Sequence, residues 1–314
     1  MADVAVIVPT LRRPDSLERA LRSLFAQTGV GDRVSEIVVV DNDPSGSAGA
    51  GVETLRRLAP WPLVYVHAPR PGVATARNAG LDATRAPLIA FLDDDEAASP
   101  GWLAALLKAQ ESTGADAVFG PITGRAPEAR DWLKPYLERF FGREGPERTG
   151  LIDTSYGCGN SLMVRATALP GPAPFDAASD QAGGEDDALF AALKARGGRF
   201  GWAAEARVEE FAPAHRATLA YALARAFAYG QGPSQTAAAA RDWPAVLRWM
   251  VIGAGQTVVW GAGAAALTLI GSSKRAELYD RTARGGGKLF WMKGFEPHFY
   301  GARELARLDR ATAA

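Results

Sequence analysis

The chain has 314 residues, enough for one large domain and an appendage, because single domains commonly contain about 100–200 residues. Hydrophobic residues make up 47% and charged residues 22%, which excludes a disordered or collagen-like protein. The 35 basic and 35 acidic residues balance, so we expect no nucleic-acid partner. The single cysteine, Cys158, has no partner for a disulfide or a CxxC zinc site, which fits a reducing cytoplasm.

The first forty residues are expected to form a β-strand, an α-helix and a second β-strand. Residues 4–8 and 37–40 are short β-branched runs between turn residues, which is typical of buried parallel strands. Residues 15–27 carry apolar side chains at helical spacing, with Asp15 or Ser16 as the N-cap. The chain therefore opens with a βαβ unit.

The same alternation continues along the chain. Further strands are predicted at residues 63–66, 88–92 and 117–119, and helices near 52–58, 74–83 and 102–112. Alternating strands and helices predict an α/β sheet. Because the ligands of such sheets bind beyond the carboxyl ends of the strands, the candidate site should lie there.

Polar segments follow three of the predicted strands. They are Pro9-Thr10-Leu11-Arg12-Arg13-Pro14, Asp41-Asn42-Asp43 and Asp93-Asp94-Asp95-Glu96. Asp93 and Asp95 are two positions apart, so both carboxylates can face one Mg²⁺ or Mn²⁺ ion whose shell is completed by substrate phosphates. A solvated acidic loop is the alternative for the aspartates, and an ordinary turn is the alternative for residues 41–43.

Six motifs in order resemble those of family two of the inverting bacterial glycosyltransferases, over roughly the first two thirds of the chain. They are Pro9-Thr10 after the first strand, Val38-Val39-Val40-Asp41-Asn42, the segment from Pro71-Gly72 to Arg77-Asn78-Ala79-Gly80, Asp93-Asp94-Asp95, Gly157-Cys158-Gly159-Asn160-Ser161, and Gly184-Glu185-Asp186-Asp187. The resemblance implies the GT-A fold, a Rossmann-like mixed and mostly parallel sheet flanked by helices. It also implies a metal-dependent transfer of sugar from a nucleotide diphosphate donor.

The resemblance places the nucleoside pocket after the first two strands. Its lining would be Pro9, Thr10, Arg12, Asp41 and Asp43. An aspartate that accepts from a base N–H suits the imide of uracil or thymine, although guanine also offers donors, so UDP is preferred while dTDP and GDP stay open. Family members often carry an acidic residue shortly after the Pro-Thr pair, where this chain has two arginines, which leaves the ribose contact open.

Other donor-binding residues follow from the same resemblance. Gly72 precedes a helix that would carry Arg77 and Asn78, and the guanidinium could bind diphosphate or nucleoside oxygens. A surface salt bridge is the alternative for Arg77. Asn160 lies in a glycine-bearing loop whose backbone could approach the donor sugar closely.

An inverting transfer is a single displacement, which needs a base for the acceptor hydroxyl and an electrophile for the leaving diphosphate. The resemblance makes Asp186 the base, with Glu185 beside the sugar. Asp95 would be the main ligand of Mg²⁺ or Mn²⁺, and Asp93 and Asp94 would support the donor sugar or the metal shell. An acidic cluster that favours a helix N-terminus is the alternative for residues 185–187, and both interpretations can hold.

Residues 1–216 are expected to form the catalytic domain, with a nucleotide-sugar half up to about residue 120 and an acceptor half at 121–216. Glu210 and His215 are candidates for a further metal or phosphate ligand, because related enzymes place such ligands there. A lone histidine is more commonly structural.

Residues 217–314 are expected to form a helical region that associates with a membrane. No charged side chain occurs from Trp249 to Gly271, and about 20 apolar residues can span a bilayer. The high glycine and alanine content suits helices at the interface at least as well, and residues 288–293 mix basic and aromatic side chains as a headgroup boundary does. We expect a peripheral or monotopic protein at the inner, cytoplasmic face of the cell membrane, with spanning left open and a buried helical hairpin as the alternative.

The sequence therefore predicts an inverting hexosyltransferase that acts on a lipid-linked or glycan acceptor in cell-surface polysaccharide synthesis. A sugar-phosphate nucleotidyltransferase could share the fold and the metal, but it normally has a glycine-rich loop after the first strand. A dehydrogenase needs such a loop as well, where this chain has Pro9 and Thr10. A catalytically idle nucleotide-sugar-binding protein is the third alternative, and the presence of Asp95 and Asp186 argues against it.

Overall fold

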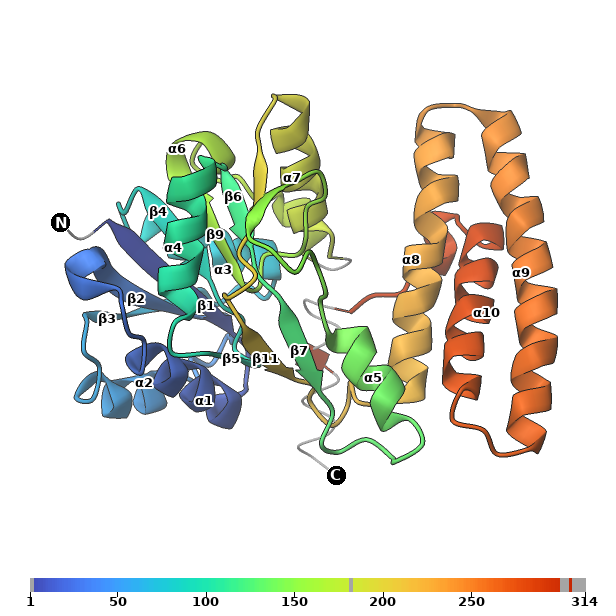
Figure 1. Cartoon of the computed structure of the whole chain (residues 1–314), viewed down its shortest axis with the longest axis horizontal. Coiled ribbons are helices and arrows are strands. Elements are labelled where there is room, and N and C mark those ends of the chain that lie inside the picture. The colour runs from blue at the N-terminus through green and yellow to red at the C-terminus, as the bar shows by residue number, and fades with distance from the viewer. Residues whose placement is uncertain (1–2, 181–182, 300–304, 307–314) are drawn as a thin grey trace. The chain divides into compact units, whose positions relative to one another are not determined.

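The structure is a computed structural model that describes residues 3–180, 183–299 and 305–306. The chain divides into two compact units (Figure 1). The first contains Met1–Thr123 and Arg143–Glu210, and the second contains Gly124–Gly142 and Phe211–Pro297. The boundaries between the units fall within strands β7 (Ile122–Arg125) and β11 (Val208–Phe211).

An eight-stranded sheet forms the centre of the first unit, in the order β3-β2-β1-β4-β9-β6-β10-β8. Its strands are β1 (Val4–Thr10), β2 (Val34–Asp41), β3 (Leu63–His67), β4 (Leu88–Phe91), β6 (Ala117–Phe119), β8 (Gly150–Ile152), β9 (Ser161–Val164) and β10 (Phe200–Trp202). The first four strands are mutually parallel, whereas β9 is antiparallel to both of its neighbours and β8 is antiparallel to β10. The sheet is mixed and mostly parallel, which confirms the predicted fold class.

Helices cover both faces of this sheet. They are α1 (Pro14–Phe25), α2 (Gly49–Arg56), α3 (Val73–Asp82), α4 (Trp102–Thr113), α6 (Arg165–Ala168) and α7 (Glu185–Ala195), with the 3-10 turns η1 (Gly31–Arg33) and η2 (Ala177–Ser179). Alternate residues of β1 enter two cores: Val4, Val6 and Val8 join the core that contains α1 and α4, and Ala5 and Ile7 join the core that contains α3 and α7. Both faces of β1 are therefore buried, which explains its continuous apolar run.

The start of α1 differs from the sequence-based expectation. The helix begins at Pro14 with Arg13 at the N-cap position, so the prediction of Asp15 or Ser16 as N-cap is wrong. Proline suits the first helical position because its φ is fixed and it has no N–H to satisfy. Asp15 lies in the first turn, where a negative charge favours the helix dipole.

The carboxyl ends of β1, β2 and β4 meet at one edge of the sheet. Thr10 lies opposite Asp41, and Ile7 lies opposite Phe91, so the segments that follow these strands start side by side. A second, three-stranded sheet has the order β5-β11-β7, with β5 (Glu96–Ala98) antiparallel to β11. The acidic segment after β4 therefore connects a strand of the large sheet, β4, to a strand of the small sheet, β5.

The second unit is helical, with α5 (Lys134–Phe141), α8 (Leu219–Ala239), α9 (Trp243–Leu269), α10 (Arg275–Leu289) and η3 (Lys293–Phe295). It includes residues 124–142, which the sequence analysis placed in the acceptor half of the catalytic domain. The physical reason is packing: Leu137 of α5 shares an apolar cluster with Ala276 of α10, and the Tyr136 hydroxyl donates to Asp280 at 3.0 Å. In the described residues one helix, α9, is long and apolar enough to cross a membrane.

Glycines let the backbones of the long helices of the second unit approach closely. Figure 1 shows α8, α9 and α10 side by side, coloured from yellow to red. A Cβ atom on Gly287 would lie 2.1 Å from the carbonyl oxygen of Phe227, and one on Gly230 would lie 2.3 Å from that of Arg284. Gly285 meets α9 in the same way, so α10 packs on both of its neighbours through backbone contacts.

The Gly287→Ala substitution is expected to lower the free energy of unfolding by about 1–3 kcal/mol, because the added methyl group forces α8 and α10 apart. Gly255→Ala in α9 is the control: nothing lies within 4 Å of an added Cβ there, and alanine favours a helix over glycine by about 1 kcal/mol. Urea denaturation followed by circular dichroism measures both. Equal effects of the two substitutions would show that the close approach at Gly287 is not needed.

Candidate active site

Asp41 holds the loop after β2 in position through hydrogen bonds. It is fully buried, and its carboxylate accepts hydrogen bonds from the N–H groups of Asp43 (3.1 Å) and Ala48 (2.7 Å) and from the Tyr65 hydroxyl (2.9 Å). Burial and the bond to Asp41 raise the pKa of Tyr65 to about 12. The Asp41 carboxylate thus positions the loop after β2, and the expected contact of Asp41 with the nucleoside stays a prediction.

Arg12 and Asp43 join the segments that follow β1 and β2. Arg12 Nε lies 3.0 Å from Asp43 Oδ1, and the Arg12 side chain is 27% exposed while that of Asp43 is buried. Burial acts to raise the pKa of Asp43, but hydrogen bonds from Ser45, Ser47 and Arg12 outweigh it and lower that pKa. Arg12 has a φ of 54°, which is uncommon outside glycine. The neighbouring Pro9 is half-buried within β1.

Asn42 links the end of β2 to the turn before α3. Its amide donates to the carbonyls of Ala68 and Arg70 at 2.8 Å each and accepts from the Gly72 N–H at 2.6 Å. A Cβ atom on Gly72 would lie 2.0 Å from the carboxyl carbon of Asp180, so no side chain fits there. Gly72, expected among the donor-binding residues, is required by the close approach of Asp180.

Asp180 and Asn78 attach α3 to the segment that precedes α7. The Asp180 carboxylate accepts from the N–H of Thr75 at 3.1 Å and from its hydroxyl at 2.6 Å. Asn78 donates to the carbonyl of Phe175 at 2.7 Å and accepts from its N–H at 3.1 Å. The predicted donor contact of Asn78 would compete with this pair of bonds. No sequence signal marked Asp180.

The three aspartates after β4 have different environments. Asp94 accepts from the Thr10 hydroxyl and from Arg13, each at 2.8 Å, and Asp95 accepts from Arg13 at 2.8 Å. The side chains of Asp94 and Asp95 are 6% and 8% exposed, whereas that of Asp93 is 38% exposed. Asp93 is therefore the carboxylate of this group that a ligand can reach most easily.

Arg77 joins the two acidic clusters of the site. It is 4% exposed, its Nη1 donates to Glu185, and its Nη2 lies 3.6 Å from Asp93 Oδ1. The guanidinium carbon lies 5.6 Å from the centre of the Phe175 ring. Burial raises the pKa values of both Glu185 and Asp93, although the charge of Arg77 opposes this. The aspartates near residue 93 and the acidic pair at 185–186 thus belong to one site.

Asp186 lies in the first turn of α7, beside the loop at residues 157–160. Its Oδ2 accepts from the Cys158 N–H at 3.1 Å, and its Oδ1 accepts from the Asp187 N–H at 2.9 Å. The side chain is partly exposed, and the absence of a side chain on Gly157 leaves room beside Oδ2. Burial raises the pKa of the Cys158 thiol well above its usual value, so a thiolate nucleophile is disfavoured.

Two further residues, the partly buried Arg143 and the buried Glu96, had no role predicted from the sequence and contact the loops of the site. Arg143 donates to the carbonyls of Gly157 at 3.0 Å and Gly159 at 2.9 Å, which fixes the loop beside Asp186. Glu96 is 1% exposed and accepts from the Asp93 N–H at 3.0 Å. Burial and neighbouring carboxylates raise the pKa of Glu96 well above its usual value, and burial lowers that of Arg143. Glu96 is the last residue of the acidic run after β4 but was given no role, whereas nothing near Arg143 in the sequence marks it.

Asn160 supports the same loop from inside the protein. It is fully buried with a φ of 52°, accepts from the Trp102 indole N–H at 2.8 Å, and donates to the carbonyls of Pro121 and Ala206 at 2.9 Å each. Its amide is therefore committed to the fold. These bonds give Asn160 a positioning role for the loop, and its contact with the donor stays a prediction.

A divalent ion would find carboxylates here, but no complete protein cage. Across the described residues, no group of three or more His, Cys, Asp and Glu side chains is arranged to hold an ion. Mg²⁺ is commonly bound by one or two carboxylates together with substrate phosphates, and the partly exposed Asp93 fits that mode. Asp95, the expected main ligand, shares one oxygen with Arg13.

Glu210 and His215, the other candidate ligands, fall in different units. Glu210 lies in the first unit and raises the pKa of the buried Glu96. His215 lies in the second unit. A shared role as metal or phosphate ligands stays a prediction for both.

A mixed, mostly parallel sheet of this order, flanked by helices on both faces, is the GT-A fold of glycosyltransferases. The chain belongs to glycosyl transferase family 2, whose sequence pattern matches residues 5–169.

Individual proteins support this assignment. The chain is 35% identical to the succinoglycan biosynthesis protein ExoM of Rhizobium meliloti over 302 residues, which cover 95% of this chain and 96% of ExoM. It is 30% identical over 149 residues to a validoxylamine A glucosyltransferase of Streptomyces hygroscopicus subsp. limoneus, covering 47% of this chain and 33% of that one. The crystal structure of S. aureus TarS 1-349 superposes on 71% of this chain and 64% of its own with a TM-score of 0.52 and 16% identity, which shows the fold alone.

Proposed function

We propose that the protein is an inverting glycosyltransferase that transfers a sugar from a nucleoside diphosphate donor, UDP in the first place, to an acceptor hydroxyl. The observation that carries the proposal is the double contact of Arg77, which brings Asp93 and Glu185 into one site beside Asp186. The nucleoside would lie beyond β1 and β2, next to the pair of Arg12 and Asp43. The sugar would then reach the acidic pair at the start of α7.

In the reaction, the acceptor oxygen forms a bond to the anomeric carbon of the sugar while the bond from that carbon to the diphosphate breaks. The acceptor proton moves to the Asp186 carboxylate, which the N–H groups of Cys158 and Asp187 hold in position. The diphosphate leaves with the bonding electrons. Attack from the face opposite the leaving group inverts the configuration of the anomeric carbon.

The departing diphosphate needs positive charge nearby. Asp93 and Asp95 would hold Mg²⁺ or Mn²⁺, which supplies electrostatic stabilisation of the leaving group. Arg12, with 27% of its side chain exposed, is a second source of positive charge from the chain itself. Arg13 is held between Asp94 and Asp95 and sets the position of both carboxylates.

The acceptor is proposed to be a growing glycan linked to a membrane lipid. ExoM carries the name of a polysaccharide biosynthesis protein and aligns with nearly the whole of this chain, which supports the same kind of pathway. The apolar helix α9 supports a place at the cytoplasmic face of the membrane, where lipid-linked intermediates are accessible. Which sugar is transferred depends on loops that the motifs do not specify.

A screen of UDP-, dTDP- and GDP-sugars tests the proposal. We expect one donor class to bind and to be hydrolysed slowly in the presence of Mn²⁺ or Mg²⁺. A chelator should lower the rate by about 10²-fold or more, because the ion supplies several kcal/mol of charge stabilisation to the leaving group. Release of nucleoside diphosphate is the readout, and calorimetry reports binding separately. If every donor that binds is left unreacted, even with membrane extract as acceptor, the result would favour a catalytically idle binding protein. If the chelator leaves the rate unchanged, the metal has no part in the mechanism.

A further inference from the structure

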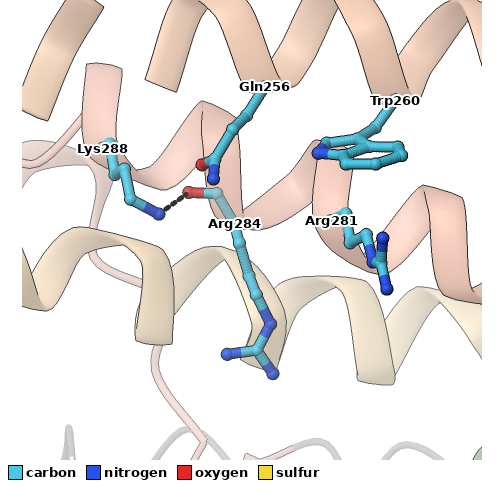
Figure 2. Close-up of a pocket in the computed structure, with 5 residues that line it drawn as sticks. All are labelled: Gln256, Trp260, Arg281, Arg284 and Lys288. Atoms are coloured by element: carbon cyan, nitrogen blue, oxygen red, sulfur yellow. Dashed lines mark hydrogen bonds between the residues drawn. The ribbon is translucent and has the colours of Figure 1, made fainter. Parts of the chain in front are cut away.

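The helical unit contains a small cavity between α9 and α10 that the proposed reaction does not use. Its volume is about 270 Å³, and its lining residues are Gln256, Trp260, Arg281, Arg284 and Lys288. Figure 2 shows Trp260 above Arg281, and Gln256 beside Lys288. Pockets for drug-sized ligands occupy about 300–1,000 Å³, so the cavity suits a group smaller than a nucleotide sugar.

The cavity carries uncompensated positive charge. Arg281, Arg284 and Lys288 are spaced by three and four residues and share one face of α10. Arg284 Nε donates to Asp280 at 2.7 Å, but within the part of the chain that the structure describes Arg281 and Lys288 form no ion pair. Arg281 lies over the Trp260 ring at 4.7 Å, and burial together with the charge of Arg284 lowers the pKa of Lys288. An anion bound here would relieve the repulsion.

A buried hydrogen-bond acceptor lies in the same cavity. Gln256 Oε1 is shielded from water and has no hydrogen-bond partner among the described residues. Buried polar atoms are almost always satisfied in proteins, so this oxygen calls for a donor such as a hydroxyl group. The cavity therefore offers two cations for a phosphate and one acceptor for a hydroxyl.

The outer face of α9 is apolar. Leu247, Val258 and Leu269 are 64%, 71% and 89% exposed, and because they lie eleven residues apart they share one face of the helix. Only 11% of the apolar stretch of α9 is buried, so this is not the core helix of a soluble hairpin. A bilayer is the surface that such a face fits.

The neighbouring α10 decides how α9 can meet the bilayer. Gly285 packs on Gly253 and Leu278 packs on Gly263, so α10 runs along the middle of α9. A crossing α9 would carry the charged residues of α10 into the hydrocarbon centre, which is strongly unfavourable. With α9 in the plane of the interface, the same charges remain at headgroup level.

From this arrangement we infer that α9 lies flat in the cytoplasmic leaflet and that the cavity binds the headgroup of an anionic phospholipid, with Arg281 and Lys288 on the phosphate and Gln256 on a headgroup hydroxyl. Phosphatidylglycerol has both groups. Between residues 219 and 289 the chain has eight basic and three acidic residues, so the whole unit complements a negative membrane. The inference rests on the proposed membrane-linked acceptor, for which it supplies a docking mode.

Vesicle flotation of the full chain tests the headgroup site. We expect binding to vesicles that contain phosphatidylglycerol and little binding to pure phosphatidylcholine. Diffuse attraction is screened by salt, whereas contacts in a partly buried site are screened much less. At raised salt, the double variant Arg281→Gln with Lys288→Gln should bind at least about tenfold more weakly than the wild type.

A matched control separates the cavity from general electrostatics. Lys274→Gln with Lys293→Gln removes the same charge from two exposed positions of the same unit, and at raised salt it should bind like the wild type. Equal losses for the two double variants would overturn the headgroup site. Circular dichroism establishes that both are folded, and Gln256→Met, which leaves the charge unchanged, should also weaken binding to phosphatidylglycerol.

Spin labels test the orientation of α9. Labels at Leu247→Cys, Val258→Cys and Leu269→Cys, in a Cys158→Ser background, span about 33 Å of helix on one face at 1.5 Å per residue. Similar immersion depths of all three are expected for a helix in the interface. A deep central label between two shallow ones would overturn the inference. Calorimetric binding of donor without vesicles is read separately, so failure of the proposed glycosyl transfer and failure of the lipid site give different results.

Discussion

Asp186→Asn is expected to lower kcat by about 10²–10⁴-fold while the dissociation constant of the donor stays unchanged. The amide cannot take the acceptor proton, but it can still accept the N–H of Cys158, so the loop beside it should keep its place. Initial rates at saturating acceptor measure the first effect, and calorimetry with the donor measures the second. A variant with the rate of the wild type would refute the assignment of Asp186 as the base.

Asp187→Asn is the control for this substitution. Asp187 is the next residue of α7, is exposed, and is not assigned a role in the reaction. The Asp187→Asn substitution removes the same charge from the same helix N-terminus, so it reproduces any general effect on the helix dipole. Rates close to that of the wild type are expected, and an equal loss in both variants would attribute the effect to electrostatics rather than to proton transfer.

Arg77→Met is expected to destabilise the protein by about 3–5 kcal/mol, because removing one partner of a buried ion pair leaves the other charge uncompensated. Glu185 is 4% exposed and loses its ion-pair partner, and Asp93 loses the guanidinium that lies 3.6 Å from its Oδ1. Turnover should fall as well, since the contact that unites the two acidic clusters is gone. Chemical denaturation and donor hydrolysis measure the two effects.

Two further variants make the Arg77 result interpretable. Arg22→Met removes an exposed partner of Glu18, with side chains 56% and 49% exposed, and should change stability by at most about 1 kcal/mol. Arg77→Met combined with Glu185→Gln should recover part of the lost stability, because no charge is then left buried beside Phe175. If the single Arg77→Met variant unfolds like Arg22→Met, the ion pair does not hold the site together.

Much of the fold could be predicted from local patterns. The β-branched runs at residues 4–8 and 37–40 became β1 and β2, and the periodic stretch near 74–83 became α3. These predictions succeeded because strands buried on both faces need continuous apolar runs and helices need apolar residues at helical spacing. The N-cap of α1 was missed because a proline and a turn residue compete for the same few positions.

The candidate site could be predicted only in part. The motifs located the acidic residues after β4 and at the start of α7, but they could not tell which carboxylates face a ligand. Asp41 and Asn160 match the family pattern and are nevertheless buried within their own hydrogen bonds. Arg143 lies in a segment without any motif, and its role depends on carbonyls of a loop more than ten residues away.

The sequence alone determined the family, the alternation of strands and helices over about the first 120 residues, and the motifs that carry the proposed site aspartates, because each of these depends on residues close together in the chain. The tertiary structure decided that Arg77 contacts both Asp93 and Glu185, which are 92 positions apart in the chain. It also decided that residues 124–142 pack with the C-terminal helices and that charged side chains of α10 lie along the middle of α9. Desolvation and contact between distant segments exist only in the folded chain, and they decide which charged groups are paired, buried or free to bind a ligand.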